Sequence, residues 1–223
     1  MLRICLCCYN YLILFFLVIF VHYKQAEMDK NDILRGNILN FHPRFNEEIL
    51  SLGIEKFDDI YIESGEHILL EGDYCDFIFF AESSIVRCYI IDDNGEENTL
   101  WIEPERMFLT DFESYKQNIP SKCYMQLYEN SKVYILKKQE LLNLYQTYHD
   151  WALFGVLIME SYFMRSLDIL NRLIYSDATE AYYFIEKHYP RYLEVVPLKH
   201  IASRLNVSPV SISRVRSGTQ KKE

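Results

Sequence analysis

The last part of the chain, residues 196–216, has the residue order of two short helices joined by a tight turn. Four apolar residues at helical spacing give the first helix one face to bury: Leu198, Ile201, Ala202 and Leu205. Asn206 stands where the turn needs a residue that tolerates positive φ. Ser208 is a natural N-cap for the second helix, and Pro209 fits its first position. The pattern predicts a helix-turn-helix, with a plain helical hairpin as the alternative.

The second helix, from residue 209 to about 216, is expected to bury Val215 together with either Val210 or Ile212. Four of its other side chains then point outward: Ser211, Ser213, Arg214 and Arg216. In a helix-turn-helix, the outward side chains of the second helix lie in the DNA major groove.

The distribution of charge favours a DNA-binding helix-turn-helix over a plain helical hairpin. Residues 196–223 hold six Lys or Arg against one Glu, a net charge of +5. Because the whole chain has a net charge of −9, the other 195 residues have −14. A basic segment on an otherwise acidic protein is the electrostatic footprint of a surface that binds phosphates.

The composition gives no sign of metal or catalytic chemistry. The chain has 223 residues, half of them hydrophobic, enough for one large or two small cores. Its cysteines form no C-x-x-C pair, which favours free thiols over zinc ligands; they are Cys5, Cys7, Cys8, Cys75, Cys88 and Cys123. His67 stands alone in a strand-like segment, and no phosphate loop, nucleophile elbow or dinucleotide fingerprint occurs. We therefore expect a protein that is not an enzyme and holds no metal or cofactor.

The first 27 residues are unlike the rest. Residues 12–21 form an unbroken apolar run, which lies within a longer and mostly apolar stretch, residues 4–23. Three interpretations stay open: a start codon assigned upstream of Met28, a membrane anchor, and a buried helix. The first predicts a cytoplasmic protein that begins at Met28, and the second a membrane-anchored one.

Residues 57–136 are typical of short antiparallel strands. Gly65 and Gly72 separate the first strands, and residues 76–81 read as a buried strand. Residues 84–91 alternate and run into an Asp-Asp-Asn-Gly turn at 92–95, which is a strong hairpin signal. This spacing predicts a small barrel or jelly roll, which with flanking helices fills residues 28–149.

A long helix is predicted over residues 150–175, because the stretch lacks proline. One stripe follows three- and four-residue steps, broken only by Glu160, and suits pairing with a second copy: Leu153, Val156, Phe163, Leu167, Leu170 and Ile174. A second stripe is suited to covering the barrel: Trp151, Phe154, Ile158 and Tyr162. Residues 176–180 cap a further helix that ends at His188, so a C-terminal domain is expected over residues 176–223.

The whole resembles the Crp/Fnr family of bacterial transcription regulators. The resemblance covers roughly residues 33–216 and is most specific at 196–203 and 211–216, where it is similar to the Bacteroidetes branch. Glycines and their neighbours at 65–66, 70–72 and 93–96 match the β-roll of the family. The resemblance implies an α+β fold: an antiparallel, cyclic-nucleotide-binding-like β-roll, a long dimerisation helix and a C-terminal helix-turn-helix domain. It also implies double-stranded DNA and a second copy as partners, with RNA polymerase as a further candidate.

Two family ligands do not fit the sequence. Cyclic-AMP-binding members have a Gly-Glu pair and a later Arg that hold ribose and phosphate, and both are absent from residues 105–111 and 120–124. Asp111 and Glu113 would repel an anion, and Lys122 lacks the bidentate fork of arginine. Oxygen-sensing members hold an iron–sulfur cluster on spaced cysteines, whereas those at positions 5, 7 and 8 are too close together. The sequence leaves the effector unidentified.

Within the resemblance, Arg214 matches a position that reads a base edge, while Lys199, Arg204 and Arg216 are candidates for phosphate contacts or for a merely solvated surface. The predicted DNA-binding residues are Ser208, Pro209, Ser211, Ser213, Arg214, Arg216, Lys199 and Arg204. We expect a sequence-specific, homodimeric DNA-binding regulator. The alternatives are a ligand-sensing or scaffold protein that no longer binds DNA, and a membrane-tethered regulator.

Overall fold

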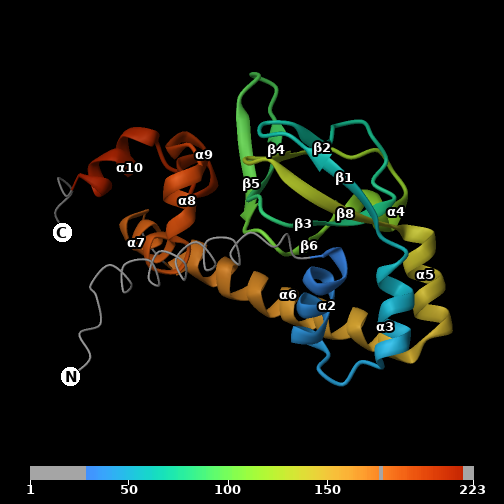
Figure 1. Ribbon diagram of the computed structural model, residues 1–223. Coiled ribbons are helices and arrows are strands. Elements are labelled where there is room, and N and C mark those ends of the chain that lie inside the picture. The colour runs from blue at the N-terminus through green and yellow to red at the C-terminus, as the bar shows by residue number, and fades with distance from the viewer. Residues whose placement is uncertain (1–28, 176–177, 218–223) are drawn as a thin grey trace, which may run out of the picture.

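The computed structural model describes residues 29–175 and 178–217. Within them, two antiparallel four-stranded sheets face one another as a β-roll, with strand orders β1-β8-β3-β6 and β2-β7-β4-β5 (Figure 1). The strands are β1 (Asp58–Ile62), β2 (His67–Leu69), β3 (Phe77–Ala81), β4 (Val86–Ile91), β5 (Glu97–Glu103), β6 (Phe108–Leu109), β7 (Tyr124–Leu127) and β8 (Ser131–Lys137). The expected small antiparallel barrel is confirmed.

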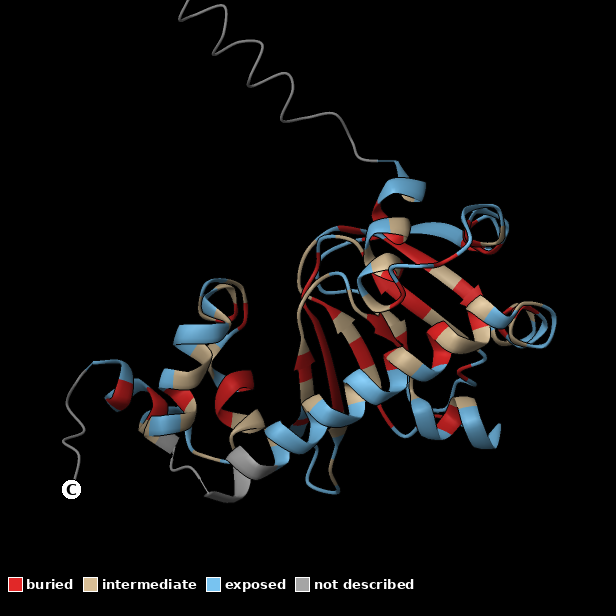
Figure 2. Ribbon diagram, turned by 90° about the horizontal axis from the view of Figure 1, so that it is seen from below, coloured by how far each residue is buried: buried red, intermediate tan, exposed pale blue. Residues whose placement is uncertain are grey.

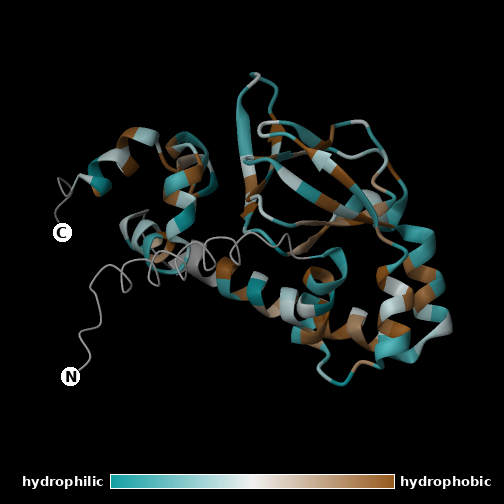
Figure 3. Cartoon of the chain, viewed as in Figure 1, coloured by the Kyte–Doolittle hydropathy of each residue, from teal (hydrophilic) through white to brown (hydrophobic). Residues whose placement is uncertain are grey.

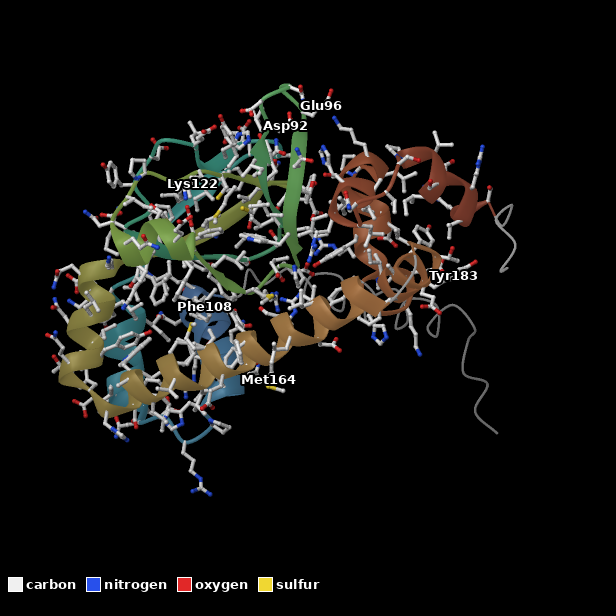
Figure 4. The ribbon with its side chains drawn as sticks, turned by 180° about the vertical axis from the view of Figure 1, so that it is seen from behind. Asp92, Glu96, Phe108, Lys122, Met164 and Tyr183 are labelled. Carbon is white, nitrogen blue, oxygen red and sulfur yellow. The ribbon has the colours of Figure 1, made fainter. Side chains whose placement is uncertain are left out.

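The turns of the β-roll lie where glycine permits positive φ. Gly65, Gly72 and Gly95 have φ values of 87°, 92° and 81°, which L side chains rarely adopt. In the β4–β5 hairpin, the Asp92 carboxylate accepts backbone hydrogen bonds from Glu96 and Asn94, each at 2.9 Å. These bonds, that of Glu96 first, lower the pKa of Asp92. The hairpin projects beyond the sheet (Figure 4).

Helices lie at the ends of the β-roll and continue into a C-terminal helical unit. They are α2 (Lys30–Phe41), α3 (Glu47–Ile54), α4 (Phe112–Gln117), α5 (Lys138–Thr147), α6 (His149–Tyr175), α7 (Ala178–His188), α8 (Pro190–Val195), α9 (Leu198–Arg204) and α10 (Pro209–Arg216). Helix α6 runs along the β-roll from α5 to the C-terminal helices, which lie beside β5 (Figure 1). Residues 176 and 177, part of the predicted cap, lie outside the described residues.

One side of α6 closes the main hydrophobic core, as the second apolar stripe predicts. Trp151, Phe154 and Ile158 are buried against α2, α3 and the β-roll, with Tyr162 half-buried beside them. The Trp151 indole donates a hydrogen bond to the Ile49 carbonyl at 3.1 Å. Its ring lies against Gly53, where a Cβ would stand 2.0 Å from a ring carbon, so the contact requires glycine.

No described helix combines the length and the apolar character that a membrane span needs. Residues 1–27, for which a membrane anchor is one interpretation, lie outside the described residues.

Candidate functional site

The predicted helix-turn-helix is present as α9, a tight turn and α10. Asn206 in the turn has a φ of 54°, as its position requires. Ser208 caps α10 by accepting a hydrogen bond from the Ser211 backbone N–H at 3.1 Å, and Pro209 occupies the first turn. A serine cap of this kind stabilises a helix by about 1 kcal/mol.

A small core sets which side of α10 faces outward. Tyr182 of α7, Ala202 of α9, and Ile212 and Val215 of α10 are buried together. Val210 is 59% exposed, so Ile212 is the partner of Val215 in this core. The opposite side of α10 is thereby fixed as its solvent face.

Most of the predicted DNA-binding residues lie on that exposed surface. Exposed side chains on α9, α10 and the turn between them include Lys199, Ser208, Pro209, Val210, Ser213, Arg214 and Arg216. Ser211 is half-buried, and its hydroxyl lies 2.9 Å from that of Ser208 within the cap. Arg204 is also half-buried and lines a cavity with Glu103 of β5, so the structure does not bring it to the same surface.

The other side of α9 is docked on strand β5. The Ser203 hydroxyl accepts a hydrogen bond from the Thr99 backbone N–H at 2.9 Å. The Tyr192 hydroxyl donates to the Ile102 carbonyl at 3.0 Å. Arg191 bridges two β-roll carboxylates, those of Glu105 at 2.5 Å and Glu129 at 2.8 Å. The C-terminal helices therefore contact the β-roll through polar bonds as well as apolar packing.

A buried histidine lies at the centre of this contact. The His200 Nδ1 atom is 2.8 Å from the Tyr128 hydroxyl, and its Nε2 atom is 3.5 Å from the Glu97 carboxylate. Burial, together with the charges of Arg87 and Lys199, lowers the pKa of His200 to about 4, against the opposing effect of Glu97. His200 is therefore neutral at pH 7, and its protonation would weaken the docked arrangement.

The charged groups beside His200 belong to one cluster within the β-roll. The Arg87 guanidinium is buried and bonds to the Glu97 carboxylate at 2.6 Å and to the Thr99 hydroxyl at 3.0 Å. It also lies over the Tyr89 ring, 4.2 Å from its centroid. The bond from Arg87 lowers the pKa of Glu97, so a carboxylate faces His200.

The outer side of α6 is exposed (Figure 2) and carries apolar side chains among polar ones (Figure 3). Phe163 and Met164 are each 63% exposed, and Met164 points away from the β-roll (Figure 4). The large apolar side chains exposed on this helix are Val156, Met159, Phe163, Met164, Leu167 and Leu170, which we call the α6 seam. Four of them belong to the predicted pairing stripe, and the two methionines adjoin it. Leu153 is half-buried, and the Ile174 side chain lies outside the described set.

In the stretch that corresponds in position to the phosphate cassette of cyclic-AMP-binding members, the protein's own carboxylates occupy the hydrogen-bond donors. At the N-terminus of α4, the Asp111 carboxylate accepts hydrogen bonds from the backbone N–H groups of Glu113 and Ser114 at 3.1 and 3.3 Å. The Lys122 ammonium is bonded to the Glu113 carboxylate at 2.9 Å, beside α4 (Figure 4). The donors that would meet an anion here are thus already paired with carboxylates.

Behind α4, apolar side chains and thiols fill the β-roll. Cys75, Cys88 and Cys123 are buried free thiols packed with Phe79 and Met125. Burial raises the pKa of Cys75, which keeps its thiol protonated. Within residues 29–175 and 178–217, no three His, Cys, Asp or Glu side chains are grouped so as to hold a metal ion. Cys5, Cys7 and Cys8 lie outside the described residues.

We expect cyclic AMP not to bind tightly. A cyclic phosphate would have to displace Asp111 from its cap and Lys122 from Glu113, with no arginine fork to compensate. Calorimetric titration of the full chain should give a dissociation constant weaker than about 1 mM. Cyclic AMP injected into buffer supplies the heat-of-dilution control. A micromolar dissociation constant would show that the cassette rearranges and that this prediction is wrong.

Sequence comparisons give no match, neither to a protein-family model nor to a curated protein. Solved structures do match. The c-di-GMP responsive global regulator CLP of Xanthomonas campestris has a TM-score of 0.61 at 13% identity, covering 78% of this chain and 92% of that one. FixK2 of Bradyrhizobium japonicum has a TM-score of 0.60 at 14% identity, covering 73% and 83%. A protein from Eubacterium rectale assigned to the Crp/Fnr family of transcriptional regulators has a TM-score of 0.60 at 16% identity, covering 81% and 88%.

These likenesses establish the fold. The chain has the α+β fold of Crp/Fnr-type regulators, in which a cyclic-nucleotide-binding-like β-roll is followed by a long helix and a helix-turn-helix. The expected fold class is confirmed.

Proposed function

We propose that this chain is a homodimeric transcription regulator that binds DNA in a sequence-specific manner and is not an enzyme. The observation that supports the proposal best is the surface of α10. Its buried side is fixed by Ile212 and Val215, so that Ser213, Arg214 and Arg216 face solvent. A short polar and cationic helix presented in this way is the element that a helix-turn-helix places in the major groove.

The exposed cations divide into two proposed roles. Arg214 reads a guanine edge, because arginine bonds to guanine in a bidentate manner worth about 1–3 kcal/mol. Lys199 and Arg216 contact phosphates, which add affinity without sequence information. Ser208 and Pro209 bring the start of α10 to the groove, with Ser211 supporting the cap. Arg204 is left out of this surface, because it is half-buried and lines the same cavity as Glu103.

The proposed partner of the α6 seam is a second copy of this chain. The exposed stripe follows the alternating three- and four-residue spacing of two paired helices. Pairing through a two-fold axis would cover the same residues on both copies and present two α10 helices. Such a dimer favours a two-fold symmetric site with half-sites about one helical turn apart.

A DNA-binding regulator of this fold acts in the cytoplasm, where RNA polymerase is a further candidate partner. The β-roll has its cassette filled by Asp111 and Lys122, so the effector is not expected to be cyclic AMP. The effector, if the protein uses one, therefore needs a different site.

Selection of bound genomic fragments with the purified full chain tests the proposal. The selection is run at about 150 mM salt, because affinity for DNA has meaning only at a stated salt concentration. It is repeated with the small-molecule fraction of cells that produce the protein, so that an effector is present. We expect a two-fold symmetric motif. Motif-free binding, or none, under both conditions would instead support a sensing or scaffold protein that no longer binds DNA.

A further inference from the structure

A cavity of about 480 Å³ lies where the β-roll, α6 and the C-terminal helices meet. Three of its walls come from β5, α6 and α7, and Tyr183 of α7 stands at this junction (Figure 4). The volume is within the range of sites that enclose a small organic molecule, about 300–1,000 Å³. The side chains of the wall are mostly aromatic or aliphatic, among them Trp101, Ile169, Phe184, Tyr189, Tyr192 and Leu205.

Four charged side chains line this cavity: Glu103 of β5, Arg165 of α6, Glu180 of α7 and Arg204 of α9. Glu180 has an interaction of its own. Glu103 of β5 and Arg165 of α6 form an ion pair, and Arg165 lies close to the Tyr189 ring. Burial raises the pKa of Glu103, although Arg165 opposes that effect. The pair is electrically neutral as a unit, so its charges are already compensated within the wall.

The guanidinium of Arg204, by contrast, does not belong to an ion pair of this kind. Among the residues that the structure describes, none forms a hydrogen bond or an ion pair with the Arg204 side chain. The Arg204 guanidinium is nevertheless partly removed from water. This burial lowers the pKa of Arg204, and the negative charge of Glu103 opposes that effect. A half-buried guanidinium without a bonded partner, in the wall of an apolar cavity, is a site for an anion.

We propose that this cavity binds a small apolar carboxylate whose carboxylate group pairs with Arg204. The ring or chain of the ligand would pack against aromatic side chains such as Trp101 and Phe184, where it loses its contact with water. A single carboxylate would supply the bonded partner that the Arg204 guanidinium lacks among the described residues. Glu103 and Glu180 line the same cavity and would repel a second anionic group, so dianions and phosphates are disfavoured.

The place of the cavity gives such a ligand a regulatory effect, and this part of the inference rests on the proposed function. The walls belong to both units, because Glu103 comes from β5 while Ile201 and Arg204 come from α9. The cavity is therefore complete only while α9 is docked on β5. A ligand that binds one arrangement stabilises it by mass action, so the carboxylate would hold the helix-turn-helix in the docked position.

Calorimetric titration of the full chain, without DNA, tests the site. The probes are benzoate, 2-naphthoate and decanoate, three apolar carboxylates of increasing size, with 2-naphthamide as a neutral match for the second. We expect at least one carboxylate to bind with a dissociation constant below about 1 mM, and 2-naphthamide to bind at least about tenfold more weakly than 2-naphthoate. Quenching of Trp101 fluorescence should follow the same isotherm, because Trp101 lies in the wall.

Two variants locate the binding. Arg204→Met keeps the length of the side chain without its charge, and should weaken carboxylate binding at least about tenfold while leaving the amide unchanged. Ala181→Leu fills part of the cavity and should weaken both ligands. Lys187→Met is the matched control, because Lys187 is an exposed cation on α7, a helix that contributes to the wall, but does not itself line the cavity. Thermal unfolding confirms that each variant is folded.

Two results would overturn the proposal. One is that none of the three carboxylates binds with a dissociation constant below about 1 mM. The other is that carboxylate binding is unchanged in Arg204→Met, which would mean that the carboxylate does not pair with Arg204, or unchanged in Ala181→Leu, which would place the ligand outside this cavity. Because this titration contains no DNA, its failure is distinguishable from a failure of the DNA selection.

Discussion

Replacing Arg214 and Arg216 together by alanine is expected to abolish sequence-specific DNA binding while leaving the fold intact. Both side chains are exposed on α10 and lie outside the core formed by Ile212 and Val215. Loss of one guanine contact and one phosphate contact in each half-site should lower affinity for the selected motif at least about 100-fold. Titration of a labelled duplex at fixed salt, followed by fluorescence anisotropy, measures the change.

The two single variants distinguish the proposed base contact of Arg214 from the proposed phosphate contact of Arg216. Arg214→Ala should relax the base preference at one position of each half-site, because a base contact is lost. Arg216→Ala should weaken binding to all sequences and lower the salt slope by about one for each half-site, because a phosphate contact is lost. Repeating the selection, and titrating at several salt concentrations, distinguishes the two effects.

The matched control for the double variant is Arg44→Ala with Lys116→Ala. Arg44 and Lys116 are exposed cations in the elements that flank the β-roll, away from α10. Replacing both removes the same amount of positive charge as replacing Arg214 and Arg216. Equal weakening by the control and by the α10 variant would mean that binding follows overall charge. Full binding by the α10 variant would exclude α10 as the DNA-reading element.

The helix-turn-helix could be predicted because its signals are local. The Asn206 conformation, the Ser208 cap and the Pro209 start each follow from the chemistry of one residue and its nearest neighbours. The β-roll was predictable for a similar reason, since Gly65 and Gly95 mark turns between alternating segments. Short or polar elements such as α4 and α8 have no comparable periodicity, and only tertiary contacts settle their extent.

The docking of α9 on β5 could not be predicted, because it joins residues far apart in the chain. Ser203 is hydrogen-bonded to Thr99, 104 residues away, and no sequence pattern around either residue indicates its partner. Periodicity places Arg204 on a helix but does not say what faces it, so the sequence could assign it only to phosphates or to solvent. The cavity beside Glu103 follows from the same long-range packing.

The two apolar stripes of α6 show what an apolar pattern in the sequence can predict. Two apolar stripes predict that the helix has two partners, and the structure identifies one of them as the core around Trp151. The other stripe is left exposed on a single chain, with Phe163 at its centre. The methionines beside it, Met159 and Met164, were missed because they lie off the strict spacing, although their size and apolar character are visible in the sequence.

Introducing charged residues into the α6 seam is expected to dissociate the proposed dimer into monomers. In the variant Phe163→Asp, Leu167→Asp, each copy would bring two carboxylates into an apolar interface, which should raise the dimer dissociation constant at least about 100-fold. Sedimentation velocity should then give a species of 26.7 kDa in place of twice that mass. Because two linked half-site contacts are replaced by one, affinity for the symmetric motif should fall about 10²- to 10⁴-fold.

Ser161→Asp is the control, because Ser161 is exposed on the same helix but lies two residues, about 200°, around the axis from Phe163. It should leave both mass and DNA affinity unchanged. A variant with both seam aspartates that remains a dimer would show that the copies meet through another surface.

A second variant tests the symmetry of the contact itself. Around a parallel two-fold axis each seam residue meets its own counterpart, so Phe163→Lys, Leu167→Lys should also dissociate by like-charge repulsion. Mixed with the aspartate variant, however, it should form a heterodimer, because every lysine then faces a carboxylate. Recovery of the dimer mass and of DNA binding only in the mixture would establish that the α6 seam pairs with itself. Recovery in neither would exclude that pairing, since charges that do not face one another cannot compensate.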